Sequence, residues 1–141
     1  MLLTIHFPDC TGEPAGPVTH QHRVDNPPAG EQDIEKVINF FTPKKVEAAF
    51  KVFDDFKSPG EDEIFPIMIK KSFDILGGLI TELFKDCIRQ CYVPITWRTS
   101  KVVFIPKVGK TDYSNPKNFR PISLMSFFQK GLERMLLWFL E

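Results

Sequence analysis

The sequence lacks an apolar run long enough to cross a bilayer. The longest uninterrupted apolar stretch of the 141 residues, at 135–140, has six residues, whereas a membrane-spanning helix needs about 18 or more. The first residues carry no basic segment ahead of an apolar one and match a secretory signal poorly. We therefore expect an intracellular protein, in the nucleus or cytoplasm, that is not secreted and has no membrane partner.

Net charge is also absent, which excludes a basic field over the whole molecule. Eighteen Lys and Arg residues balance eighteen Asp and Glu residues. The balance hides an asymmetry, because residues 1–92 carry ten basic and fifteen acidic residues and residues 93–141 carry eight and three. Between residues 94 and 131, seven basic residues accompany a single acid, Asp112. An anionic partner would bind there, although a Lys-rich strand pair that only discourages edge pairing remains an alternative.

Cysteines and self-contained catalytic motifs are few. The three cysteines cannot all pair, and Cys87 and Cys91 lie four residues apart in an apolar stripe, which predicts buried free thiols. The sequence has no P-loop, nucleophile elbow, zinc-protease helix or paired zinc-type cysteine motif. His20 and His22 have no third ligand near them, and the acidic residues 61–63 are typical of a solvated loop. We predict neither a complete active site nor a metal site.

Prolines and glycines divide the chain in two. Residues 1–31 hold five of the twelve prolines and three of the eight glycines, which predicts a flexible Pro/Gly-rich linker ahead of a folded domain at 32–141. Apolar residues recur at helical spacing from Ile34 to Phe41 and predict a first helix. Thr42 and Pro43 suit the start of a second helix, which we expect to end near Phe56.

Further elements follow from the same patterns. We expect a third helix from residue 66 to about 76, interrupted at Gly77 and Gly78, and a fourth helix that ends by residues 93–94. Residues 101–105 and 118–124 predict a two-stranded ribbon, in which Pro121 limits the second strand to an edge. The expected fold class is α+β, mostly helical with one two-stranded β-ribbon.

A capping-box pattern, Ser126 with Gln129, predicts the last helix. This helix carries an apolar stripe, but Leu137, Trp138 and Leu140 also make its other faces apolar near the end. Because a helix that is apolar all round must be covered, we expect it to need another part of a larger protein or another chain.

Five short strings occur in order along the chain. They are Lys-Ser-Pro-Gly-x-Asp-x-Ile at 57–64, Val-Pro-x-x-Trp at 93–97, Val-x-Ile-Pro-Lys-x-Gly-Lys at 103–110, Phe-Arg-Pro-Ile-Ser-Leu at 119–124 and Lys-x-x-Glu-Arg at 130–134. Together they resemble the polymerase region of non-LTR (LINE-type, Jockey-like) retrotransposon reverse transcriptases. Thr-x-His-Phe-Pro at 4–8 also resembles the connector after the endonuclease domain of such polyproteins.

The resemblance implies the N-terminal extension and an incomplete fingers part of a right-hand polymerase fold. The palm of that family, with its metal-binding aspartates, would follow this region, so we expect a truncated fragment with no catalytic residue, no metal ligand and no cofactor of its own. The full-length RNA-directed DNA polymerase would use Mg²⁺, a deoxynucleoside triphosphate and an RNA or DNA template. By the same resemblance, Lys107 and Arg120 match the cations that grip the phosphates of the incoming nucleotide. Lys101, Lys110 and Lys117 would meet template phosphates.

One position departs from the family pattern. The Pro-Gly-x-Asp-Gly-Ile loop of the family becomes Pro-Gly-Glu-Asp-Glu-Ile at 59–64, so Glu63 replaces a glycine. If this position requires a positive φ, Glu63 costs about 1 kcal/mol or more. Together with the expected absence of a palm, that substitution favours a decayed or truncated copy of the element over a working enzyme. Two other functions remain open: a small helical module that binds nucleic acid, or one that binds a protein partner.

Overall fold

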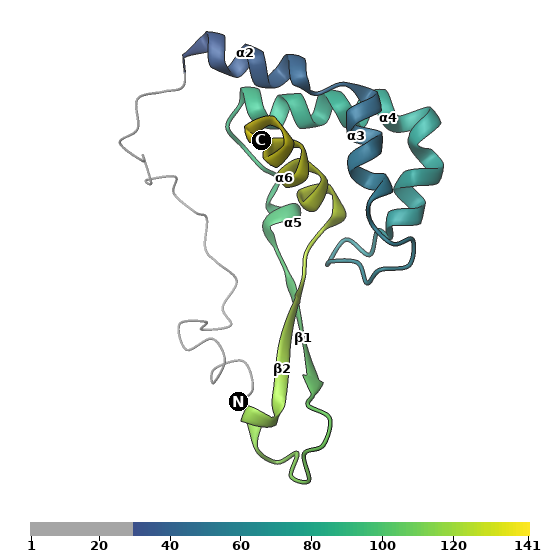
Figure 1. The fold of residues 1–141 in the computed structure, drawn as a ribbon, viewed down its shortest axis with the longest axis vertical. Helices are drawn as coiled ribbons and strands as arrows, with labels where there is room; N and C mark the ends of the chain where they lie inside the picture. Colours follow the sequence, from purple (N-terminus) through teal and green to yellow (C-terminus); the bar gives the residue numbers. More distant parts are fainter. Residues whose placement is uncertain (1–29) are drawn as a thin grey trace. The chain divides into compact units, whose positions relative to one another are not determined.

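The computed structural model describes residues 30–141, which form two units (Figure 1). The linker predicted at 1–31 falls outside the described residues except for its last two, and Cys10, His20 and His22 lie outside them as well. The helical unit comprises residues 30–101 and 124–141, and the ribbon unit comprises residues 102–123. None of the described helices is long and apolar enough to cross a membrane.

The described elements confirm the expected fold class. The helices are α2 (Glu31–Phe40), α3 (Pro43–Lys51), α4 (Pro66–Arg89), α5 (Ile95–Arg98) and α6 (Phe127–Leu140). The strands β1 (Lys101–Pro106) and β2 (Phe119–Leu124) pair into one antiparallel sheet, and a short 3₁₀ helix, η1 (Pro116–Asn118), precedes β2. The ribbon and the last helix therefore lie where the sequence predicts them.

Aromatic rings fill the core of the helical unit. Phe50 of α3 is fully buried, and its ring lies 6.1 Å from that of Phe84 on α4 and 6.0 Å from that of Phe128 on α6. Trp97 of α5 stacks on Phe128 with centroids 5.3 Å apart and is itself buried. A Cβ on Gly131 would lie 2.9 Å from Cζ of Phe50, so the glycine lets α6 approach α3 closely. The core thus joins four helices through side chains distant in sequence.

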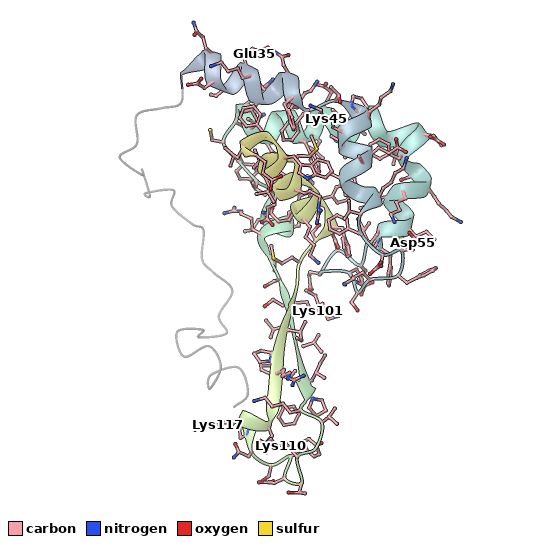
Figure 2. The ribbon with its side chains drawn as sticks, in the orientation of Figure 1. Glu35, Lys45, Asp55, Lys101, Lys110 and Lys117 are labelled. Carbon is pink, nitrogen blue, oxygen red and sulfur yellow. The ribbon has the colours of Figure 1, made fainter. Side chains whose placement is uncertain are left out.

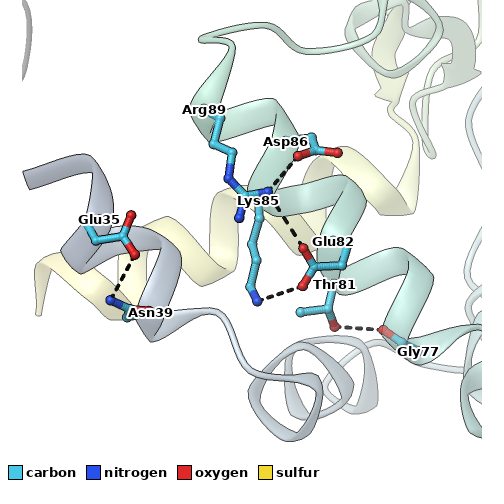
Figure 3. Close-up of polar contacts among 8 residues, drawn as sticks. All are labelled: Glu35, Asn39, Gly77, Thr81, Glu82, Lys85, Asp86 and Arg89. Carbon is cyan, nitrogen blue, oxygen red and sulfur yellow. Dashed lines mark hydrogen bonds and ion pairs between the residues drawn. The ribbon is translucent and has the colours of Figure 1, made fainter. Parts of the chain in front are cut away.

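The prediction of two helices around the glycine pair is wrong, because α4 is continuous over 24 residues. Gly77 is buried, and a Cβ there would collide with the Phe73 ring one turn earlier. Thr81 is also buried, and its hydroxyl donates to the Gly77 carbonyl at 2.7 Å (Figure 3). Phe73 and Phe84, from either side of the glycines, enter the same core. Tertiary packing therefore offsets the roughly 1 kcal/mol that each glycine costs a helix.

The end of α3 also differs from the prediction. The helix ends at Lys51, not near Phe56. The ammonium of Lys70 on α4 donates to the Phe53 carbonyl at 2.6 Å and pairs with Asp55 at 2.7 Å. These contacts draw the chain into a turn against α4, and the Phe53 ring packs edge-on against Phe127.

Only one of the two described cysteines is buried. Cys87 lies in the core, whereas Cys91 is exposed, so the prediction of a buried thiol at Cys91 is wrong. Cys91 follows the last turn of α4 with φ 48°. The amide of Tyr92 donates to the Cys87 carbonyl at 3.0 Å, and the amide of Cys91 donates to the Ile88 carbonyl at 3.2 Å. This is a Schellman motif, which turns Cys91 out of the apolar stripe.

The capping box of α6 forms in part. The Ser126 hydroxyl accepts from the Phe128 amide at 3.2 Å, as a cap should. The Gln129 amide nitrogen donates to Glu133 at 2.7 Å, while its Oε1 has no hydrogen-bond partner within the described residues. The other half of the capping box, in which Gln129 Oε1 would accept from the Ser126 amide, is therefore absent. Leu137 and Leu140 are 54% and 79% exposed, whereas Trp138 packs partly against the core.

Candidate nucleic-acid interface

The register of the ribbon places the two predicted nucleotide-binding cations on one face. The Lys107 amide donates to the Asn118 carbonyl at 2.8 Å, immediately beyond the paired strands. In an antiparallel pair this sets Lys107 opposite Asn118 and Ile105 opposite Arg120. Because side chains alternate between faces, Lys107 and Arg120 are diagonal neighbours on the same face. Val103, Ile105 and Ile122 on that face are exposed.

Lys107 and Arg120 have different surroundings. Lys107 is a partly buried residue, and its ammonium donates to the Lys117 carbonyl at 2.7 Å. Within residues 30–141 this leaves two of its three N–H groups for other acceptors. Arg120 is exposed, and its guanidinium makes no hydrogen bond or ion pair within residues 30–141. Arg120 can therefore bind an anion without breaking a contact to any of the described residues.

The other three predicted lysines are all exposed. Figure 2 shows Lys110 and Lys117 at the loop end of the ribbon, while Lys101 is the first residue of β1. No acidic side chain within the described part of the chain forms an ion pair with any of them. Their positions along the ribbon fit contacts to an extended anion.

The loop of the ribbon is ordered by polar residues that the sequence reasoning missed. Asp112 accepts from the Ser114 hydroxyl at 2.5 Å and from the Ser114 amide at 2.8 Å, and these bonds hold the pKa of the Asp112 carboxyl below its usual value. Asn118 donates to the Asp112 carbonyl at 2.6 Å, and the Tyr113 hydroxyl donates to the Lys107 carbonyl at 3.3 Å. The Asp-x-Ser spacing is a turn signal that could have revealed this role. The single acid of the basic segment thus shapes the loop, and among residues 30–141 it pairs with no cation.

The 57–64 loop is attached to the start of α6. Asp62 accepts from the Ser126 hydroxyl at 2.6 Å, across 64 positions of sequence. A Cβ on Gly60 would lie 2.6 Å from the Ser126 nitrogen, so only glycine permits this approach. The expectation of a wholly solvated acidic loop is therefore wrong for Asp62, although Glu61 and Glu63 are exposed. Glu63 has φ 55°, which confirms the conditional prediction of a positive φ.

The string at 93–97 contributes to packing of the core. Trp97 is a core residue, so its role in this string is to stabilise the fold of the helical unit.

Within residues 30–141, no group of three or more His, Cys, Asp or Glu side chains lies close enough together to hold a metal ion.

Comparison with known proteins places the chain near one class, the retrotransposon RNA-directed DNA polymerases. The chain is 30% identical over 81 residues to the RNA-directed DNA polymerase from mobile element jockey of Drosophila melanogaster, and 29% identical over 103 residues to the probable RNA-directed DNA polymerase from transposon X-element of the same species. It is also 30% identical over 80 residues to the retrovirus-related Pol polyprotein from type-1 retrotransposable element R1 of Bradysia coprophila.

These similarities are distant and partial. The three matches cover 57%, 73% and 57% of this chain, in the order given, but only 9%, 11% and 8% of the relatives. The chain therefore spans about a tenth of the length of the curated relatives it matches. No known protein-family profile matches the sequence. The resemblance to non-LTR retrotransposon reverse transcriptases is confirmed at this level.

Proposed function

We propose that this chain is the N-terminal extension and fingers part of a retrotransposon RNA-directed DNA polymerase, and that its ribbon binds phosphates of the incoming nucleotide and the template. The observation that carries the proposal is the diagonal placement of Lys107 and Arg120 on one exposed face, with Asp112 engaged elsewhere. Partial similarity to such polymerases supports the same assignment.

The two cations suit different parts of one triphosphate. The Arg120 guanidinium is a planar fork that can donate two parallel hydrogen bonds to one phosphate. The Lys107 ammonium is a compact charge with two free donors, fixed by its bond to the Lys117 carbonyl. Lys101, Lys110 and Lys117 would contact template phosphates, which contributes affinity without reading the bases.

Polymerisation would depend on the rest of the longer protein. A two-metal mechanism needs carboxylates that hold two divalent ions near the primer hydroxyl and the leaving pyrophosphate. We propose that a palm region supplies those carboxylates with Mg²⁺, and that this chain contributes binding alone. The same remainder of the polymerase would cover the exposed residues Leu137 and Leu140 of α6.

Salt-dependent binding tests the role of the ribbon. We would measure affinity for a fluorescent single-stranded RNA, and for a competing deoxynucleoside triphosphate, as the salt concentration rises. Lys110→Gln and Lys117→Gln, which remove proposed template contacts, should each reduce the steepness of log RNA affinity against log salt by about 0.7 for a single strand. Arg120→Gln and Lys107→Gln should instead weaken binding of the competing triphosphate. Lys71→Gln, an exposed lysine on α4, is the matched control. A slope near zero for the unaltered chain, or equal losses in the control, would contradict the proposal.

A primer-extension assay tests the proposal that this chain contributes binding and a palm region contributes catalysis. The purified chain should add no deoxynucleotides to an annealed primer above a metal-free control. Extension by this chain would show that it contributes more than binding.

A further inference from the structure

A second cationic surface lies on the helical unit, where α6 meets the turn after α3. A pocket of about 370 Å³ is lined there by Phe53, Lys130, Glu133, Arg134 and Leu137. Lys130 and Arg134 are four residues apart on α6, so both project from the same face of the helix. This pocket shares no residue with the ribbon.

Aromatic rings hold the two cations in place. The Lys130 ammonium lies 4.3 Å from the centroid of the Phe127 ring, and the Arg134 guanidinium carbon lies 5.2 Å from that of Phe53. The two rings pack edge to face with centroids 5.2 Å apart. A cation over a ring face gains modest electrostatic stabilisation while its charge remains unneutralised. Both charges are thus positioned in advance of any ligand.

The pocket lining has one carboxylate, Glu133, for its two cations. No carboxylate forms an ion pair with Lys130 or Arg134 within residues 30–141. Arg134 Nε is buried and has no hydrogen-bond partner in the described part of the chain. Burial, followed by the nearby charge of Lys57, lowers the pKa of the Lys130 ammonium, although Asp62 and Glu133 act in the opposite direction. The positive charges of Lys130 and Arg134 are therefore not neutralised by an ion pair within the described residues.

We propose that Lys130 and Arg134 bind a backbone phosphate of a nucleic acid, at a site separate from the ribbon. This inference rests on the proposed nucleic-acid-binding function and extends it to α6. The two cations and Glu133 give the pocket lining a formal charge of +1, which one phosphodiester neutralises. A run of peptide carboxylates or a phosphate dianion would bring excess negative charge towards Glu133, so the lining favours the phosphodiester.

Paired variants test the site. We would measure binding of a fluorescent single-stranded RNA at several salt concentrations to the unaltered chain, to Lys130→Gln/Arg134→Gln and to the control Lys44→Gln/Lys71→Gln. The control removes two exposed lysines that make no ion pair in the described residues. We expect the pocket variant to bind about tenfold more weakly near 0.1 M salt and to lose about one unit of salt slope. The control should change little.

Two further variants keep the test sharp if the double variant folds poorly. Lys130→Arg/Arg134→Lys retains both charges and should bind within about twofold of the unaltered chain. Glu133→Gln removes a carboxylate from an exposed position of the pocket lining. It should tighten binding about twofold, because the Glu133 carboxylate repels the negative charge of the phosphate. No change, or weaker binding, in Glu133→Gln would overturn the proposal.

The outcomes separate this site from the ribbon. If Lys110→Gln weakens RNA binding while the pocket variant matches its control, the pocket proposal fails and the proposed function stands. If the unaltered chain binds no RNA, both fail. Displacement of the RNA by inorganic phosphate at equal phosphate concentration would assign the pocket to free phosphate, and equal displacement by polyglutamate would assign it to an acidic peptide. Either result would overturn the backbone assignment.

Discussion

Two residues adopt a backbone conformation that their side chains disfavour. Glu63 has φ 55° and Cys91 has φ 48°, in the left-handed region that glycine enters most readily. At Cys91 the conformation closes the Schellman motif after α4. At Glu63 it completes a loop whose neighbours Gly60 and Asp62 contact the start of α6. The loop adopts this geometry although position 63 carries glutamate and not glycine, the residue that favours a positive φ.

This conformation makes Glu63→Gly a stabilising substitution. Removal of Cβ relieves about 1–2 kcal/mol of strain in the folded chain. The greater conformational freedom of glycine stabilises the unfolded chain, which cancels part of that gain. We expect the free energy of unfolding in urea to rise by about 0.5–1 kcal/mol. Glu61→Gly, at an exposed position where φ is not positive, is the control and should lower it. A decrease for Glu63→Gly would show that the strain is relieved elsewhere.

Burial sets the chemistry of Cys87, the buried one of the two described thiols. Burial, and next the charge of Asp86, raises the pKa of the Cys87 thiol. A raised pKa leaves less thiolate at neutral pH, so Cys87 is inert as long as the core is intact. The helical spacing of Cys87 and Cys91 predicts that both are buried, whereas only Cys87 is.

At the scale of elements, α4 shows how packing overrides local propensity. Ion pairs on its exposed side add support, with Lys85 2.8 Å from Glu82 and Arg89 2.7 Å from Asp86 (Figure 3). Exposed pairs of this kind contribute little each. The buried side, through Phe73, Gly77 and Phe84, is the main reason that the helix continues past its glycines.

The two adjacent glycines should respond oppositely to alanine. A Cβ at Gly78 meets nothing within 4 Å, so Gly78→Ala should raise the free energy of unfolding by about 1 kcal/mol through helix propensity. A Cβ at Gly77 would collide with the Phe73 ring, so Gly77→Ala should lower it by about 1–3 kcal/mol. Denaturant unfolding of the two variants checks both signs. Stabilisation by both would mean that Phe73 moves aside freely.

At the scale of the whole molecule, the helical unit leaves much apolar surface uncovered. A groove of about 500 Å³ is formed by α2, the end of α4 and α6, and Ile34, Ile88 and Leu136 are among its lining residues. On α4, Ile75 and Leu79 are 86% and 70% exposed. Apolar grooves and large exposed apolar side chains of this kind are typical of surfaces that another part of a protein covers.

This uncovered surface should make the isolated chain associate. We expect light scattering to detect oligomers at micromolar concentrations, together with binding of a hydrophobic dye. Leu137→Lys/Leu140→Lys, at exposed positions of α6, should reduce both signals without loss of folding. Leu132→Ala, at a buried position, should instead cost about 2–5 kcal/mol of stability and leave association undiminished. A monomeric chain that binds no dye would contradict both the missing-partner interpretation and the protein-interaction alternative.

The sequence alone determined the features that depend on neighbouring residues. The β-branched run before Pro106, the Ser126 cap and the helical spacing from Ile34 each specify a local structure that the fold retains. The five strings also located Lys107 and Arg120 near the ends of two strands.

Tertiary structure decided what depends on residues far apart. Strand register set Lys107 and Arg120 on one face, packing around Phe73 kept α4 whole, and the turn after α4 exposed Cys91. The cationic pocket requires Phe53 beneath Arg134, a contact between α6 and the turn after α3. Local patterns carry no information on such contacts, because their free energy comes from surfaces that meet only when the chain is folded.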